Sequence, residues 1–385
     1  MKDFLLLEPA LNPEEIQIRD TLRAFVARQV IPKMALAFEE ARYPEDLTRP
    51  LAELGVLGMT LPPEYGGAGA SYVSYGLACQ ELEYGDSSLR SLVSVQSSLV
   101  MFPIYHYGSC EQKQQFLPRL ARGELIGCFG LTEADSGSDP ASMHTKAQAV
   151  EGGFCLNGSK MWITNGNCAD VALVWAKTES GFGGFLVEKG TPGFIQREVK
   201  HKMSLRVSQT GELIFNDCFI PSSHFLPGTE KGLSCALKCL NQARYGIAWG
   251  AIGAAQACYD TALEYCQTRK QFNKPLASFQ LVQKDLVEML NEIVKAQTLN
   301  LHLGRLMDKG EAHYAMISLA KMNACKAALN IARSARNLLG ANGISLEYPV
   351  IRHMNNLESV FTYEGTDNIH HLIVGRYITG VDALG

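Results

Sequence analysis

The sequence contains no Cys-x-x-Cys pair, and its 11 cysteines are an odd number that disulfide pairing cannot use up. Cys235 and Cys239 have the spacing of one helix face, but no nearby His or Cys completes a metal-ligand set. We therefore interpret them as core thiols. These absences argue against a disulfide scaffold and against a structural metal, and they indicate a reducing compartment.

The sequence also lacks an excess of positive charge, since its net charge is -4. This gives no electrostatic reason to expect binding to nucleic acid or to an anionic membrane. The uncharged run Ser91–Cys110 contains five Ser, a Gln, a His and Pro103, so it is not interpreted as a membrane span. The apolar run near Met1 is too short for a signal peptide, and the predicted location is cytoplasmic.

The pattern of apolar residues predicts an α, then β, then α order along the chain. We expect an α+β multidomain protein with an N-terminal helical domain, a middle β-barrel-like domain and a C-terminal four-helix bundle. The expected boundaries are 1–123, 124–227 and 228–385. With 385 residues, the chain is long enough for two or three domains with sizeable cores.

Local signals place several elements within these parts. Asn12 with Pro13 and Glu15 predicts a helix start, and Pro32 is expected to end that helix. Asn157-Gly158 is expected to form a hairpin turn between strands. Further helices are predicted over Tyr72–Glu83, Ser88–Met101, Glu111–Ala121, Leu233–Gln267, Gln280–Met307 and His313–Leu339.

One stretch, Val360–Asn368, holds a lone carboxylate, Glu364, between aromatic residues and a glycine. Thr366 behind it can N-cap a helix whose first turn carries Asp367. By itself, Glu364 is more simply interpreted as a cap or a surface carboxylate than as a catalytic group. Four other motifs change this interpretation.

The first motif, Gly130–Asp139, follows a strand and offers hydroxyls and backbone N–H groups around glycines, which suits the polar edge of a heterocycle or a thioester. A Ser-rich turn is its simpler explanation. The others are Met161–Thr164, Thr268–Gln280 and Leu339–Gly343. The simpler explanation of Met161–Thr164 is that Trp162 is a core aromatic residue. The simpler explanation of Thr268–Gln280 is that Arg269 complements a helix dipole.

In their order along the chain, these motifs resemble those of the acyl-CoA dehydrogenase family. The resemblance covers the chain from its first helix to its last, with two departures: Ala341 replaces a Gly, and Asn337 stands where an acid or Gln is usual. It implies a homotetramer with FAD at subunit contacts, and Arg269 reaching the FAD of a neighbouring subunit. The implied FAD contacts are Phe129, Leu131, Thr132, Ser138, Trp162, Thr164, Arg269, Gln280, Asn337, Gly340, Ala341 and Thr366.

The same resemblance makes Glu364 the catalytic base, because the position used by some relatives is Ala243 here. It also implies electron transfer to an electron-transfer flavoprotein. The implied substrate contacts are Glu83, Arg90, Ser91, Ser138, Thr164, Asn241, Arg244, Tyr363 and Gly365.

Three stretches, Glu83–Ser91, Asn241–Gly250 and Thr362–Thr366, resemble the glutaryl-CoA dehydrogenases within the family. There a buried Arg, matched by Arg90, holds the distal carboxylate of glutaryl-CoA, to which a guanidinium is well suited. We therefore expect oxidative decarboxylation of glutaryl-CoA to crotonyl-CoA and CO₂. Two alternatives are open: a short-chain monocarboxylic acyl-CoA dehydrogenase, with Arg90 paired to Asp86 or Glu83, and a catalytically silent acyl-CoA-binding protein.

Overall fold

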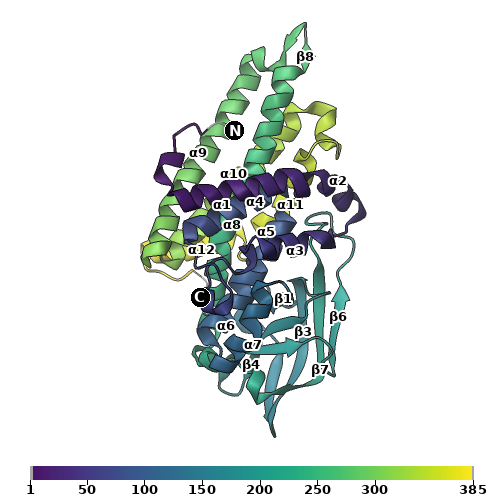
Figure 1. Ribbon diagram of the computed structural model, residues 1–385, viewed down its shortest axis with the longest axis vertical. Helices are drawn as coiled ribbons and strands as arrows, with labels where there is room; N and C mark the ends of the chain where they lie inside the picture. Colours follow the sequence, from purple (N-terminus) through teal and green to yellow (C-terminus); the bar gives the residue numbers. More distant parts are fainter. Residues whose placement is uncertain (1–2, 384–385) are drawn as a thin grey trace.

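The structure, a computed structural model, describes residues 3–383. A curled sheet lies at one end of its long axis, a small hairpin projects at the other end, and the two helical parts meet between them (Figure 1). The helices of the first part are α1 (Pro13–Phe25), α2 (Ile31–Glu40), α3 (Thr48–Glu53), α4 (Tyr72–Gly85), α5 (Ser87–Ser94), α6 (Phe102–Tyr107) and α7 (Cys110–Ala121). A π-helical segment, Val95–Met101, joins α5 to α6.

The sheet has seven strands in the order β1-β4-β2-β3-β7-β6, with β5 paired to β4. Pairing is antiparallel except that β1 and β2 each run parallel to β4. The strands are β1 (Gly127–Gly130), β2 (Lys146–Val150), β3 (Gly153–Thr164), β4 (Val171–Thr178), β5 (Gly181–Glu188), β6 (Phe194–Glu198) and β7 (Thr210–Pro221).

The last part is helical again and carries the projecting hairpin. Its elements are α8 (Leu233–Thr268), β8 (Lys270–Gln271), β9 (Lys274–Pro275), α9 (Gln280–Lys309), α10 (Tyr314–Leu338), α11 (Val350–Thr362) and α12 (Asp367–Thr379). The α-β-α architecture is confirmed. The expected boundary after residue 123 falls between α7 and β1, and the one after residue 227 falls at the first residue of a short 3-10 helix, Pro227–Lys231. Both remain a prediction about units that fold independently.

Two local predictions are confirmed and one is wrong. Asn12 and Glu15 form a reciprocal capping box at the start of α1, and Cys235 and Cys239 are buried core thiols. Pro32, however, does not end the helix. A π-helical segment, Val26–Val30, leads into α2, and Pro32 lies in the first turn of α2, directly after the π-helical turn that lets the helix continue.

The expected hairpin at Asn157-Gly158 is also wrong, because both residues lie inside β3. The Asn157 side chain accepts from Asp217 N at 2.8 Å, which ties β3 to β7. Gly158 sits at a register shift, and a Cβ there would lie 2.6 Å from Thr145 Oγ1. Close approach of Thr145, the residue just before β2, rather than a turn, therefore explains the glycine.

The run Ser91–Cys110 lies in α5, α6 and the segments around them, and no helix within residues 3–383 is long and apolar enough to cross a membrane.

Glycines allow α4 and α8 to pack closely in the centre of the molecule. A Cβ on Gly76 would lie 2.4 Å from the Trp249 ring, and one on Gly253 would lie 1.9 Å from Gln80 O. Both contacts are too short for any side chain. The small residues of α8 therefore set the distance between the helical parts.

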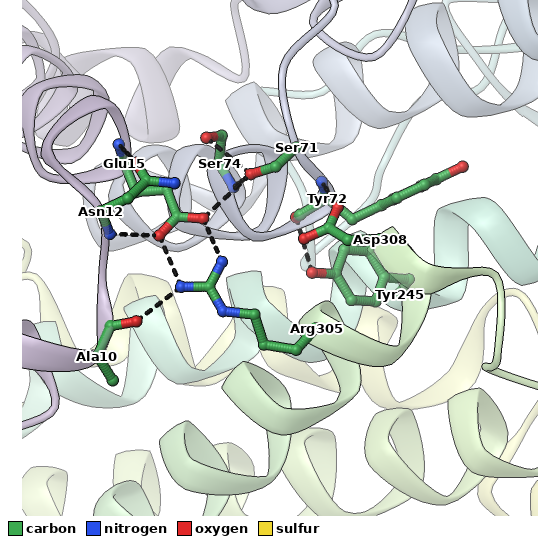
Figure 2. Close-up of polar contacts among 9 residues, drawn as sticks. All are labelled: Ala10, Asn12, Glu15, Ser71, Tyr72, Ser74, Tyr245, Arg305 and Asp308. Atoms are coloured by element: carbon green, nitrogen blue, oxygen red, sulfur yellow. Dashed lines mark hydrogen bonds and ion pairs between the residues drawn. The ribbon is translucent and has the colours of Figure 1, made fainter.

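A buried carboxylate fastens α1 to the C-terminal part (Figure 2). Glu15 is fully buried and accepts from Arg305 Nη1 at 2.5 Å and Nη2 at 2.8 Å. Beside it, Tyr72 N donates to Asp308 Oδ1 at 2.6 Å, and Tyr245 OH donates to Tyr72 O at 2.7 Å. This network joins α1, α4, α8 and α9.

Replacing Arg305 with Met should lower stability by about 2 kcal/mol, because Glu15 would keep its buried charge without a partner while Arg305 itself is partly exposed. Thermal unfolding measures the effect. Lys284→Met, which removes an exposed partner of Glu288, is the control and should change little. An equal loss of thermal stability in Arg305→Met and Lys284→Met would contradict this account of the network.

Candidate active site

Glu364 lies in the turn between α11 and α12, in a conformation that side chains rarely adopt. Its φ is 52°, and that of Gly365 is 101°. A Cβ on Gly365 would lie 2.9 Å from His370 Nε2 and 3.2 Å from Arg244 Nη2. Thr366 then caps α12 by accepting from Ile369 N at 3.3 Å, as predicted. The turn is thus held in a strained form by its neighbours.

The carboxylate of Glu364 has an unusual electrostatic environment. Its Oε2 atom is buried and has no hydrogen-bond partner among the described residues. Burial raises the pKa of Glu364 to about 6, against the opposing effect of the cations Arg90, Arg244 and Lys321. A carboxylate with a pKa near 6 is a stronger base than an ordinary Glu and is still ionised at neutral pH.

Arg244 and Asn241 lie together on α8 beside this turn. Arg244 Nε donates to Glu364 O at 2.7 Å, and its Nη1 donates to Asn241 Oδ1 at 3.4 Å. The structure therefore brings these two predicted residues next to Glu364. Arg244 holds the backbone of the turn through a carbonyl rather than the Glu364 side chain.

A second buried group surrounds Arg90, whose side chain is 1% exposed. Arg90 Nε donates to Glu83 Oε2 at 2.5 Å, and Nη2 donates to the hydroxyl of Tyr363, the neighbour of Glu364. Glu83 Oε1 is buried and has no hydrogen-bond partner among the described residues. Gly250 makes room for this pair, since a Cβ there would lie 2.1 Å from Glu83 Oε2.

The expected alternative partner of Arg90, Asp86, is occupied elsewhere. It N-caps α5 through Ser88 N at 2.8 Å, and its other oxygen accepts from Arg352 and from Asn356 Nδ2 at 3.0 Å. The partner of Arg90 is Glu83, and the pair lies in the core rather than on the surface. Burial raises the pKa of the Glu83 carboxyl despite Arg90. Ser91 is buried beside Arg90 on α5.

The predicted residues of the β-part gather along β1, β3 and the loop after β1. Trp162 lies at a register shift of β3 with a φ of 64°, and its side chain is 61% exposed. Met161 N donates to Thr132 O at 2.9 Å, which joins β3 to that loop. Thr164 pairs with Thr210, and Ser138 is exposed.

An apolar cluster links the β-part to α8. Phe129 and Leu131 are buried in the same cluster as Ala243, the neighbour of Arg244 on α8. That these residues and the Glu364 group form one site stays a prediction.

The remaining predicted residues lie apart from both groups. Arg269 and Gln280 flank the β8–β9 hairpin, and Asn337, Gly340 and Ala341 lie around the end of α10, all exposed. Asn342 Nδ2 donates to Tyr265 OH at 3.0 Å, which holds this end of α10 near the hairpin. The hairpin and the sheet are at opposite ends of the long axis (Figure 1). One chain therefore does not bring these residues to its own Trp162.

Two buried lysines were not predicted. Lys160 donates to Leu131 O at 3.0 Å and to Glu133 Oε1 at 2.8 Å, beneath the loop after β1. Lys321 donates to backbone carbonyls on both sides of Glu364. A signal for the second was present: Lys321 falls on the apolar stripe of its helix with Ile317, Ala324 and Ala328.

Comparison with known proteins agrees with this architecture. Family models match along the chain: acyl-CoA dehydrogenase, N-terminal domain (residues 12–124), middle domain (128–218) and C-terminal domain (230–379). The mitochondrial short-chain specific acyl-CoA dehydrogenase of Sus scrofa is 35% identical over 373 residues, covering 95% of this chain and 90% of that protein.

Two crystal structures of glutaryl-CoA dehydrogenase from Mycobacterium smegmatis are more similar. They are 52% and 50% identical, each with a TM-score of 0.98 and covering 100% of this chain and 99% of theirs; the second is a complex with FADH2. The chain belongs to the acyl-CoA dehydrogenase family.

The residues along β1 and β3 fit the flavin cofactor of this family. Trp162 presents a large exposed ring at a strained backbone position, which offers a flat apolar surface to a heterocycle. Thr132, on the loop bonded to Met161, and Thr164, two residues after Trp162 on β3, carry hydroxyl groups.

Proposed function

We propose that this FAD-dependent acyl-CoA dehydrogenase oxidises and decarboxylates glutaryl-CoA to crotonyl-CoA and CO₂. The observation that carries the proposal is the buried guanidinium of Arg90, directed toward the Glu364 turn through Tyr363. The distal carboxylate of a substrate can accept hydrogen bonds from this guanidinium, which it would share with Glu83.

The chemistry assigned to the protein is proton transfer and charge stabilisation. Glu364 removes the Cα proton, and FAD, when bound, accepts the hydride from Cβ. The negative charge that develops on the thioester oxygen needs N–H donors, and the peptide N–H of Glu364 is the proposed protein donor. Asn241 and Arg244 are proposed to contact the CoA portion.

Decarboxylation follows from the position of the second carboxylate. After oxidation this group lies one carbon beyond the new double bond, so loss of CO₂ leaves a dienolate whose charge reaches the thioester oxygen. The terminal carbon then takes back the proton that Glu364 had acquired. Glu83 and Tyr363, both in contact with Arg90, are proposed to hold the carboxylate end for this step.

The electrons are proposed to pass to an electron-transfer flavoprotein, and the enzyme to act as a homotetramer. The second proposal is supported by the separation of Arg269 and Gln280 from the sheet, because only another chain could bring them to the Trp162 region. Exposed apolar side chains on the same elements, Phe272 at 87% and Leu281 at 76%, also favour a covered surface.

A short-chain monocarboxylic substrate is the second candidate. The Arg90–Glu83 contact, which already pairs the cation inside the protein, is compatible with it. The comparisons do not favour it, because the short-chain specific relative is 35% identical whereas the glutaryl-CoA dehydrogenase structures are 50% and 52% identical.

Glu364→Gln should slow flavin reduction by glutaryl-CoA at least ~10²-fold, because the amide cannot accept the proton. In the parent enzyme, kcat/KM should fall as the pH drops through about 6, since the protonated Glu364 carboxyl is no longer a base. Stopped-flow absorbance measures both. Glu358→Gln, an exposed change on α11, is the control. Near-parental flavin reduction in Glu364→Gln would assign the base elsewhere.

Arg90→Met should weaken glutaryl-CoA oxidation by about 2–5 kcal/mol, because the distal carboxylate would be buried without a cation. Butyryl-CoA oxidation should change far less, so the ratio of kcat/KM values for the two substrates is the measurement. Arg23→Met removes the Arg partner of Glu81 on α4 and should leave this ratio unchanged. An equal loss on both substrates would make Arg90 structural and favour the monocarboxylic alternative.

The unmutated enzyme should release crotonyl-CoA and CO₂ in equal amounts from glutaryl-CoA with an artificial electron acceptor. Glu83→Ala combined with Tyr363→Val should shift the product towards glutaconyl-CoA while flavin reduction survives. Chromatography of the CoA esters and trapping of labelled CO₂ give the product ratio. Glutaconyl-CoA as the sole product of the parent enzyme would refute the decarboxylating function.

A further inference from the structure

Lys321, in the middle of α10, is 1% exposed and directs its ammonium group at the Glu364 turn. Its Nζ donates to Gly365 O at 2.8 Å, to Tyr363 O at 3.0 Å and to Phe361 O at 3.4 Å. A lysine ammonium has three N–H donors, so these three carbonyls use all of them.

Burying the Lys321 ammonium group in the helix core costs free energy. Lys321 forms no ion pair with any carboxylate in the described part of the chain, and a buried cation held only by neutral groups loses its hydration without full compensation. Phe361 lies in the last turn of α11, where a cation is favoured by the helix dipole. That explains one contact, but not those to Tyr363 and Gly365, which lie beyond the helix.

The geometry points to Lys321 as the positioning residue of the active-site turn, holding the peptide N–H of Glu364 toward the thioester. A peptide unit is planar, and its C=O and N–H point in opposite directions when it is trans. Because Tyr363 C=O is drawn to Lys321, the N–H of Glu364 in the same peptide unit points away from α10. Arg244 fixes the next peptide unit in the same way, through Glu364 O.

Lys321 also places a positive charge near the Glu364 carboxylate. The other charged groups that act on this carboxylate are Arg90 from α5 and Arg244 from α8, and Arg90 is paired with Glu83 from α4. Asp367 follows in the first turn of α12.

The remaining titratable neighbours, Tyr363 and His370, carry no charge near neutral pH. Burial raises the pKa of Tyr363, and burial together with Lys321 and Arg244 lowers the pKa of His370 to about 3. The charge of Lys321 lowers the pKa of Glu364, so it keeps the base ionised near neutral pH.

This inference rests on the proposed role of Glu364 and adds a residue that does not touch the substrate. A merely structural lysine would affect stability and FAD content. A positioning lysine also affects the rate of flavin reduction at high pH, where Glu364 is fully ionised. In addition, it affects the pH below which this rate falls.

The test uses the FAD-loaded enzyme and single-turnover flavin reduction by glutaryl-CoA from pH 5 to about 9. Lys321→Met removes both donors and charge. The plateau rate should fall roughly 10- to 100-fold, and the acid limb should move up by about 1 pH unit. Lys321→Gln keeps an amide donor without the charge, so its acid limb should move as far while its plateau falls less. Lys326→Met, an exposed change on the same helix, should match the parent.

A folded, FAD-loaded Lys321→Met with the parent plateau and acid limb would overturn the inference, as would a variant that loses only thermal stability. If Glu364→Gln remains active, the proposed role of Glu364 as the base fails. If Glu364→Gln is inactive and the Lys321 variants keep the parent profile, this inference alone fails.

Should neither Lys321 variant fold, a crystal structure of the parent enzyme with a bound acyl-CoA decides the question. We expect Lys321 Nζ within hydrogen-bond distance of Tyr363 O and Gly365 O, and Glu364 N facing the thioester oxygen. A Glu364 N–H turned toward α10 would overturn the inference.

Discussion

The site depends on burying several charged side chains inside a helical core. Arg90, Arg244 and Lys321 come from α5, α8 and α10, and each is satisfied by groups on other elements: Glu83 of α4, or the carbonyls around Glu364. A buried charge without its partner costs several kcal/mol. The helices therefore cannot shift relative to one another without losing a partner, and this fixes the position of the Glu364 turn.

The same requirement explains why a strained residue can persist there. Glu364 has a positive φ, which is unfavourable for a side chain, yet three successive carbonyls, those of Tyr363, Glu364 and Gly365, are held by cations. At the other end of α11, Arg352 contacts Gly85 O at 2.9 Å, next to the start of α5. Both ends of α11 are thus tied to the helices that carry the site, and the strained backbone at Glu364 lies at the residue whose N–H is the proposed donor to the thioester.

The β-part contributes a second constraint of the same kind. The loop after β1 is held by Lys160 through Leu131 O and Glu133, and by Met161 N through Thr132 O. These contacts fix Trp162 and the loop relative to each other, so the proposed flavin surface is formed before any ligand binds. Burial lowers the pKa of Lys160 to about 8, and its bond to Glu133 opposes that effect. Rigid support on both sides is what a site for a flat cofactor requires.

The sequence by itself determined the order of helical and β-parts, the caps at Asn12 and Thr366, and the residue types that place the chain in its family. These signals are local: a cap or an apolar period is read from neighbours a few residues away. Local signals failed at Pro32 and Asn157-Gly158, where a π-helical segment and the close approach of Thr145 overrode them. Only the tertiary structure decided that Arg90 pairs with Glu83 rather than Asp86 and that Lys321 holds the Glu364 turn. It also decided that Arg269 lies far from Trp162. Each of these depends on which helices meet, and burial, which makes the pairings strong, exists only after the chain has folded.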